Sequence, residues 1–95
     1  MKLISVEAAF ATANLEAAMT LLEAQLDEVR AMDGCNHYAL FKTSGGDGLA
    51  ILQRWETMTQ FDAYQSSDTF AKLGAGLRQL MSAPPVTTIA QVDQA

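Results

Sequence analysis

Three glycines within the five-residue stretch SGGDG, residues 44–48, set the strongest constraint on how this chain can fold. Glycine readily adopts the positive φ angles that a tight chain reversal needs. The segments on either side, residues 35–42 and 49–55, alternate in polarity and contain many β-forming side chains. The sequence therefore predicts an antiparallel hairpin at the middle of the chain.

The period of two assigns a face to each residue of this hairpin. In the second strand, Ile51, Gln53 and Trp55 are expected on one face. In the first strand, Tyr38 is expected to pack near the sheet with its hydroxyl at the tip. It should lie opposite a face formed by Cys35, His37, Ala39 and Phe41.

Strand and helix patterns flank the hairpin on both sides. Residues 2–11 alternate with a period of two, which predicts a first strand, and residues 86–92 form a last strand. Between the first strand and the hairpin, a helix is predicted to begin at an Asn14 cap and to end before Gly34. Its apolar stripe consists of Leu15, Met19, Leu22, Leu26 and Val29.

A second helical region follows the hairpin. It is predicted to open at Met58 and Thr59, where Asp62 approximates a capping box, and to start again at Ser67. We expect its two glycines to permit close packing of this helix on the sheet. The apolar stripe contains Phe70, Leu73, Leu77, Leu80 and Met81, and the glycines are Gly74 and Gly76.

The predicted order is strand, helix, strand, strand, helix, strand. This is the βαββαβ arrangement of a ferredoxin-like α+β domain, in which helices cover one face of an antiparallel sheet. The other face is left uncovered and carries large or apolar residues. A homodimer that packs sheet against sheet would bury such a face, and two-fold symmetry is the commonest arrangement.

Composition narrows the class of protein further. Ninety-five residues, of which 49% are hydrophobic and 18% charged, predict one globular domain spanning residues 1–95. A net charge of −5 opposes binding to nucleic acid. Cys35 is the only cysteine, so no intrachain disulfide can form. The chain shows neither a signal-peptide pattern nor an apolar run of about 20 residues, so we expect a soluble, cytoplasmic protein without a membrane partner.

Familiar site motifs are missing from the sequence. It contains no glycine-rich phosphate loop and no serine-nucleophile signature. One histidine and one cysteine do not make a zinc site within one chain. The sequence therefore predicts neither a metal nor a cofactor.

Four segments in order, DGCNHYALFK, ILQRWE, FDAYQSSDTFAKL and SAPPV, resemble the landmarks of the antibiotic biosynthesis monooxygenase family. The resemblance extends from Lys2 to about Val92. It implies a ferredoxin-like protomer that pairs into a dimeric α/β barrel, with a cavity between the sheet and the helices. Some members of this family insert oxygen into quinols or polyketide phenols without flavin or metal, and others cleave haem.

The chain departs from the family pattern at two positions. Gln53 replaces a glutamate found in many members, and Tyr64 replaces a histidine, so two acid-base groups are lost. The haem-degrading branch has an asparagine on its first strand and a histidine on its second helix. This chain has neither, which disfavours haem cleavage.

Cofactor-free oxygenation requires a deprotonated, electron-rich substrate in a dry pocket. His37 is the only side chain with an ordinary pKa near neutrality, so it is the candidate base, although a histidine on a strand is also a common structural residue. Trp55 and Tyr64 are candidates for the pocket wall, or else core aromatic residues. The other candidate substrate contacts are Gln53, Ile51 and Phe61.

Two hypotheses follow from these residues. The first is a homodimeric, cofactor-independent monooxygenase, an oxidoreductase acting on a small quinol or phenolic compound. The second is a non-catalytic dimer that binds a small molecule or acts as a stress-associated accessory protein. The loss of acid-base groups at Gln53 and Tyr64 favours the second hypothesis.

Overall fold

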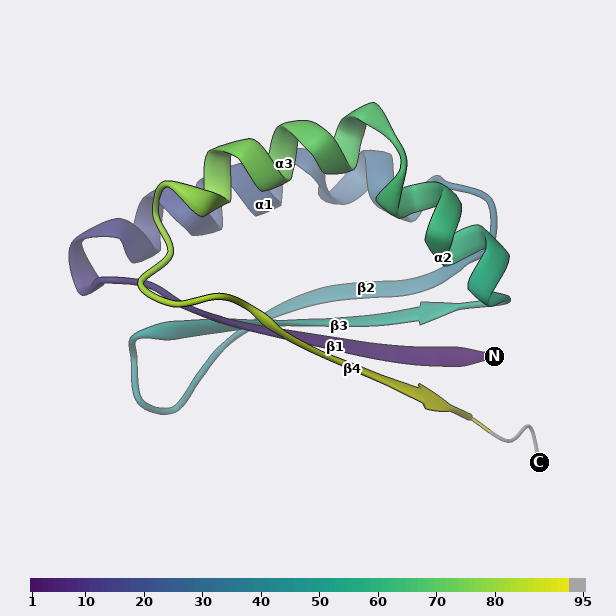
Figure 1. Ribbon diagram of the computed structural model, residues 1–95, viewed down its shortest axis with the longest axis horizontal. Coiled ribbons are helices and arrows are strands. Elements are labelled where there is room, and N and C mark those ends of the chain that lie inside the picture. Colours follow the sequence, from purple (N-terminus) through teal and green to yellow (C-terminus); the bar gives the residue numbers. More distant parts are fainter. Residues whose placement is uncertain (93–95) are drawn as a thin grey trace.

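The computed structural model describes residues 1–92 as one antiparallel sheet with three α-helices on one of its faces (Figure 1). The strand order is β2-β3-β1-β4. This is the predicted ferredoxin-like α+β fold. The elements are β1 (Lys2–Ala9), a short 3-10 helix η1 (Thr12–Asn14), α1 (Leu15–Arg30), β2 (Cys35–Lys42), β3 (Gly48–Trp55), α2 (Met58–Gln65), α3 (Asp68–Arg78) and β4 (Val86–Gln91).

The two central strands carry the core residues of the sheet. Ile4 of β1 pairs with Gln53 of β3, so both side chains point toward the helices, and Trp55 lies on the same face. The predicted alternation of β1 and β3 is thus confirmed. The side chains that these strands bury beneath the helices include Ile4, Leu49, Ile51, Gln53 and Trp55.

A β-bulge between Cys35 and His37 changes the predicted faces of β2. Cys35 pairs with Trp55, whereas His37 pairs with Arg54, the next residue back along β3. The prediction that Cys35 and His37 share a face is therefore wrong, because the extra residue of a bulge shifts the alternation by one. Tyr38 packs on the sheet with its side chain on the helix-covered face, opposite that of His37, and is 2% exposed.

Helix α1 packs its predicted apolar stripe on the sheet, with Leu22 and Val29 buried. Its start differs from the prediction, because the Asn14 side chain makes no capping hydrogen bond and instead donates to the Leu80 carbonyl oxygen at 3.3 Å. Asn14 thus joins α1 to the segment after α3. Beyond the helix, Gly34 adopts a φ of 84° where the chain turns into β2.

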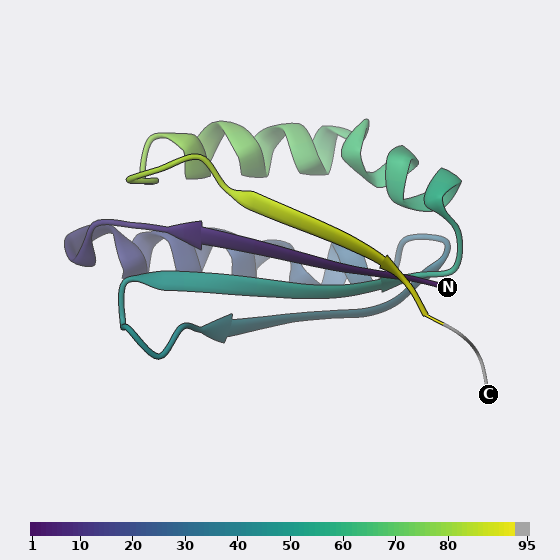
Figure 2. The same ribbon diagram turned by 60° about the horizontal axis from the view of Figure 1, so that its bottom comes forward.

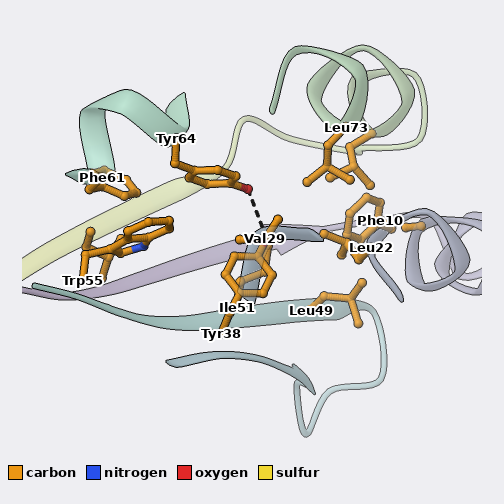
Figure 3. Close-up of a cluster of buried hydrophobic side chains, with 13 residues drawn as sticks. Phe10, Leu22, Val29, Tyr38, Leu49, Ile51, Trp55, Phe61, Tyr64 and Leu73 are labelled. Atoms are coloured by element: carbon orange, nitrogen blue, oxygen red, sulfur yellow. Dashed lines mark hydrogen bonds between the residues drawn. The ribbon is translucent and has the colours of Figure 1, made fainter. Parts of the chain in front are cut away.

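The predicted start of α2 is wrong, and the predicted start of α3 is correct. Helix α2 is capped by Thr57, whose hydroxyl accepts from the Gln60 backbone N–H at 3.2 Å, and not by Thr59. Helix α3 begins after Ser67, as predicted, and the Ser67 hydroxyl accepts from the Phe70 N–H at 3.2 Å. The break between α2 and α3 brings Phe61 and Tyr64 over the end of the sheet that holds Trp55 (Figure 3).

We predicted that the two glycines of α3 permit close packing of this helix on the sheet, and this prediction is wrong. A Cβ atom at Gly76 would lie 3.0 Å from Leu21 Cδ1, so this glycine lets α3 approach α1. Gly74 lines a cavity beneath the helix. Because it has no side chain, Gly74 leaves space in the cavity; it does not bring α3 closer to the sheet backbone.

The sheet face opposite the helices displays apolar side chains to solvent. Phe41 is 51% exposed, and Val86 on the edge strand β4 is 61% exposed. Leu52 and Ala39 pair across β3 and β2 on this open face. Among residues 1–92, no helix is both long and apolar enough to cross a membrane.

Candidate functional site

A cavity of about 250 Å³ lies between the helices and the sheet. The cavity is slightly smaller than the pockets of about 300 to 1,000 Å³ that hold drug-sized ligands, so it suits a molecule of one or two fused rings. The strands contribute its floor and α1, α2 and α3 its roof. Its apolar walls include Val6, Ile51, Phe61, Phe70, Leu73 and Met81.

The mouth of the cavity lies where α3 faces the edge strand β4. Figure 2 shows β4 at one edge of the sheet, with β2 at the other. Four exposed residues border the cavity on this side and connect it with solvent: Gln65, Arg78, Pro85 and Thr87.

The buried end of the cavity contains a pair of tyrosines. The Tyr38 and Tyr64 hydroxyl oxygens lie 3.3 Å apart, and their rings meet edge to face (Figure 3). Either hydroxyl can donate to the other. Whichever does so, the second keeps an O–H proton that can be donated to a ligand.

Burial determines the protonation state of this pair. Removal from water raises the pKa of Tyr38, and the neighbouring Tyr64 raises it further. Burial also raises the pKa of Tyr64, although its hydrogen bond with Tyr38 opposes the shift. Both phenols are therefore protonated at neutral pH, and they act as hydrogen-bond donors rather than bases.

Gln53 adds an amide group to the same end of the cavity. Its side chain is 3% exposed, and its Oε1 atom accepts from the Trp55 indole N–H at 2.9 Å. Since an indole N–H only donates, the oxygen must face Trp55 and the NH2 group must point away from it. Within residues 1–92 this NH2 group has no hydrogen-bond acceptor, so it remains available to a bound molecule.

Trp55 supports this site from behind and does not line the cavity. Its side chain is fully buried, and its ring stacks on Tyr64 with centroids 5.3 Å apart and an angle of 19°. Phe61, also on α2, belongs to the same cluster, with its ring centroid 6.1 Å from that of Trp55 and 6.3 Å from that of Tyr64. Trp55 thus fixes the position of Gln53 through a hydrogen bond and that of Tyr64 through ring stacking. Figure 3 shows Tyr64 above the Trp55 ring.

The structure brings together most of the residues singled out in the sequence. Tyr64, Gln53, Ile51 and Phe61 all line the cavity. His37 does not: it is exposed, and it lies on the opposite face of the sheet because its partner is Arg54. The β-bulge before His37 and the thickness of the sheet separate its imidazole from the cavity.

The cavity residues that sequence reasoning did not assign to the site include Tyr38 and Arg78. The pairing of Tyr38 with Gln53 follows from the hairpin register, which the turn alone did not define. Arg78 follows Gly74 by four residues, so the two lie on one face of α3. This spacing was a usable signal once Gly74 was known to border a cavity.

Residues 1–92 contain no group of three or more histidine, cysteine, aspartate or glutamate side chains close enough to hold a metal ion. Cys35 is half-buried, and burial raises the pKa of its thiol above the ordinary value. A thiol with a raised pKa is a weak nucleophile at neutral pH.

A helix-covered antiparallel sheet with an apolar cavity and buried donors defines the class, an α+β ferredoxin-like protein with an internal ligand-sized cavity. The family model described as "Antibiotic biosynthesis monooxygenase" matches residues 3–75, which is most of the chain. The chain belongs to this family.

Comparisons with individual proteins agree with this assignment. "Putative monooxygenase Rv0793" of Mycobacterium tuberculosis is 30% identical over 80 residues, which cover 83% of this chain and 79% of the relative. Its solved structure superposes with a TM-score of 0.91 at 24% identity, over 99% of this chain and 97% of the other. A structure from Caulobacter crescentus CB15 has a TM-score of 0.93 at 16% identity, with 98% and 90% covered. The latter likeness shows the shared fold.

Proposed function

We propose that this protein is a cofactor-independent monooxygenase for a small phenol or quinol bound in the cavity. One observation carries the proposal: the buried end of an otherwise apolar cavity presents hydrogen-bond donors from Gln53 and the Tyr38–Tyr64 pair. Such donors stabilise an oxygen atom that carries negative charge. Membership of a monooxygenase family supports the same reaction class.

In the proposed reaction, the phenolate of the substrate gives one electron to dioxygen. The resulting radical and superoxide combine at a ring carbon to form a C–O bond. Loss of water from this peroxide breaks the O–O bond and leaves a second carbonyl, so a phenol and dioxygen yield a quinone and water. One oxygen atom enters the product, and the other leaves as water with the two hydrogens that the substrate loses.

The donors have a defined task in this scheme. The free O–H of the tyrosine pair and the NH2 group of Gln53 hold the phenolate oxygen and lower the cost of placing its charge in an apolar cavity. Phe61 and Ile51 contact the ring. Trp55 is a positioning residue, because it orients Gln53 and Tyr64 without lining the cavity.

The proposed scheme lacks a general base within the cavity. The described lining contains neither a carboxylate nor an imidazole, and His37 lies across the sheet. The substrate must therefore bind as an anion or lose its proton through the mouth. This observation also favours the second candidate function, a non-catalytic protein that binds a small phenolic or carbonyl compound in the same cavity.

Oxygen uptake distinguishes the two functions. Metal-stripped protein is mixed with naphthols and naphthohydroquinones at several pH values, and dioxygen consumption is followed together with quinone formation. Turnover should fall about 10²- to 10³-fold in the double variant Tyr38→Phe/Tyr64→Phe, because the hydroxyl donor that the pair offers to the substrate anion is then lost. Lys72→Gln, a change of an exposed residue on α3, serves as the control. Saturable binding of these phenols without oxygen uptake at any pH would favour the binding function.

We also propose that a second copy of the chain covers the open sheet face. This face carries the exposed Phe41 and Val86 and the half-buried Leu52. Contact of these apolar side chains with water is unfavourable, and such a patch commonly marks an interaction surface. Pairing through a two-fold axis lets one surface cover its equivalent.

A further inference from the structure

The cavity has a second polar region, at the end away from the tyrosine pair. Arg78 is the only residue with a formal charge among those that line the cavity. It lies three residues before Met81, which forms a bridge with Phe10 beyond the end of β1. Along β3 the cavity extends from Leu49 at one end to Gln53 at the other. Four residues of strand separate these two ends by about 13 Å.

The Arg78 side chain extends over the cavity rather than away from it. A Cβ atom placed on Gly74 would lie 3.4 Å from Arg78 Nη2, so the guanidinium folds back along α3 toward the preceding turn. Gly74 itself lines the cavity. Within residues 1–92 the guanidinium forms no ion pair with a carboxylate, so its charge is available to another anion.

The surroundings of Arg78 select an anion. The other exposed polar residues at the mouth, Gln65 and Thr87, are neutral hydrogen-bonding groups, and the cavity lining contains no carboxylate that would repel one. The chain as a whole has a net charge of −5, so a general electrostatic field does not draw anions to the protein. A local guanidinium therefore provides the recognition, for which its fork of N–H donors suits a carboxylate.

We propose that the natural ligand is an aromatic compound with an acidic arm, whose carboxylate pairs with Arg78 while its ring oxygen meets Gln53 and Tyr64. The inference deepens the proposed function by naming the class of substrate. It assigns Arg78 to specificity at the mouth, and it separates that role from the donors at the buried end.

A matched pair of probes tests the inference by binding alone. One probe is a hydroxynaphthoate whose hydroxyl and carboxylate lie at opposite ends of the ring pair, and the other is its methyl ester. Binding is measured by titration calorimetry in low and high salt. The acid should bind more tightly than the ester by about tenfold, a preference that salt should reduce.

Three variants assign the preference to Arg78. Arg78→Gln should abolish the preference by weakening only the acid, and Arg78→Lys should keep part of it. Lys72→Gln removes the same charge from an exposed position of α3 and should leave the preference intact. Thermal melting checks that each variant is folded, because a cation in the last turn also stabilises a helix.

Three other outcomes would overturn the inference. Equal binding of acid and ester by the wild-type protein would remove the acidic arm, and equal weakening of both in Arg78→Gln would make Arg78 structural. Failure of both probes to bind would refute the two-ended site. Binding of the acid through Arg78 without oxygen uptake would instead refute the proposed oxygenation and leave this inference standing.

Discussion

The Trp55 indole N–H donates to Gln53 Oε1 across 2.9 Å, and both side chains are buried. Through this contact Trp55 orients the Gln53 amide, which lines the cavity, although Trp55 itself does not line it. The Trp55 ring also stacks on Tyr64, so one residue positions two of the three donors. The functional contribution of Trp55 therefore depends on the packing of the core.

We predict that Trp55→Phe lowers the free energy of unfolding by about 2 to 4 kcal/mol. The change leaves a void and removes the donor of the buried Gln53 oxygen. Urea denaturation measures the loss. In the double variant with Gln53→Leu, about 1 to 2 kcal/mol should be regained, because the unpaired carbonyl is gone. Strict additivity of the two single losses would contradict the importance of this hydrogen bond.

Alkaline pH should destabilise the protein through Tyr38 and Tyr64. Burial raises the pKa of both hydroxyls above the ordinary value, so the folded state holds these protons more tightly than the unfolded chain. Their contribution is therefore fully present below about pH 10 and is lost as the pH rises further, by up to about 1.4 kcal/mol per pH unit for each tyrosine.

Urea denaturation from pH 8 to pH 11 provides the test of this dependence. The double variant Tyr38→Phe/Tyr64→Phe should show a flatter dependence of unfolding free energy on pH above about pH 10. An unchanged slope would show that other groups cause the alkaline loss.

Two glycines with positive φ angles give a matched comparison of backbone strain and steric conflict. Gly34 and Gly46 have φ values of 84° and 79°. A Cβ atom at Gly34 would lie 2.2 Å from Gln60 Oε1, whereas one at Gly46 would meet nothing within 4 Å. Gly46→Ala should cost about 1 to 2 kcal/mol from backbone strain alone. Gly34→Ala should cost more, because Gln60 must also leave its contacts with Thr57 and Asp33.

Thermal or urea unfolding of both variants measures this difference. Equal losses would show that the Gln60 side chain moves aside without cost. A larger loss in Gly34→Ala would instead identify the contact between the β2 turn and α2 as a fixed support for Phe61 and Tyr64.

We predict that His37→Gln keeps turnover within about twofold of the wild-type value, if the protein oxygenates phenols. A general base contributes about 10²- to 10⁴-fold, so its removal would be evident. His37 lies on the open face, away from Tyr38 and Gln53. Steady-state oxygen uptake as a function of pH measures the effect, and a large loss in the variant would restore His37 as the base.

The sequence predicted the fold well because period and turn chemistry act locally. The alternation of Ile51, Gln53 and Trp55, and the cap at Ser67, required no knowledge of distant residues. The position of His37 depended on a bulge, which one unpaired residue creates without a clear sequence signal.

The cavity was harder to predict for a related reason. Its polar end joins Tyr38 on β2 to Tyr64 on α2, two residues that are 26 positions apart. Its mouth depends on where α3 crosses the edge of the sheet. Such relationships arise from packing between elements, so residue patterns identified Tyr64 and Gln53 but neither Tyr38 nor Arg78.

The last prediction concerns the open sheet face. The wild-type chain should sediment at micromolar concentration with twice its mass of 10.2 kDa. Phe41→Glu should shift the equilibrium to the monomer, because two-fold pairing places the new carboxylate in the interface twice. Ala24→Glu adds the same charge to an exposed position of α1 and should leave the dimer intact. A monomeric wild-type chain would refute the pairing, and a dimeric Phe41→Glu variant would move the interface to another surface.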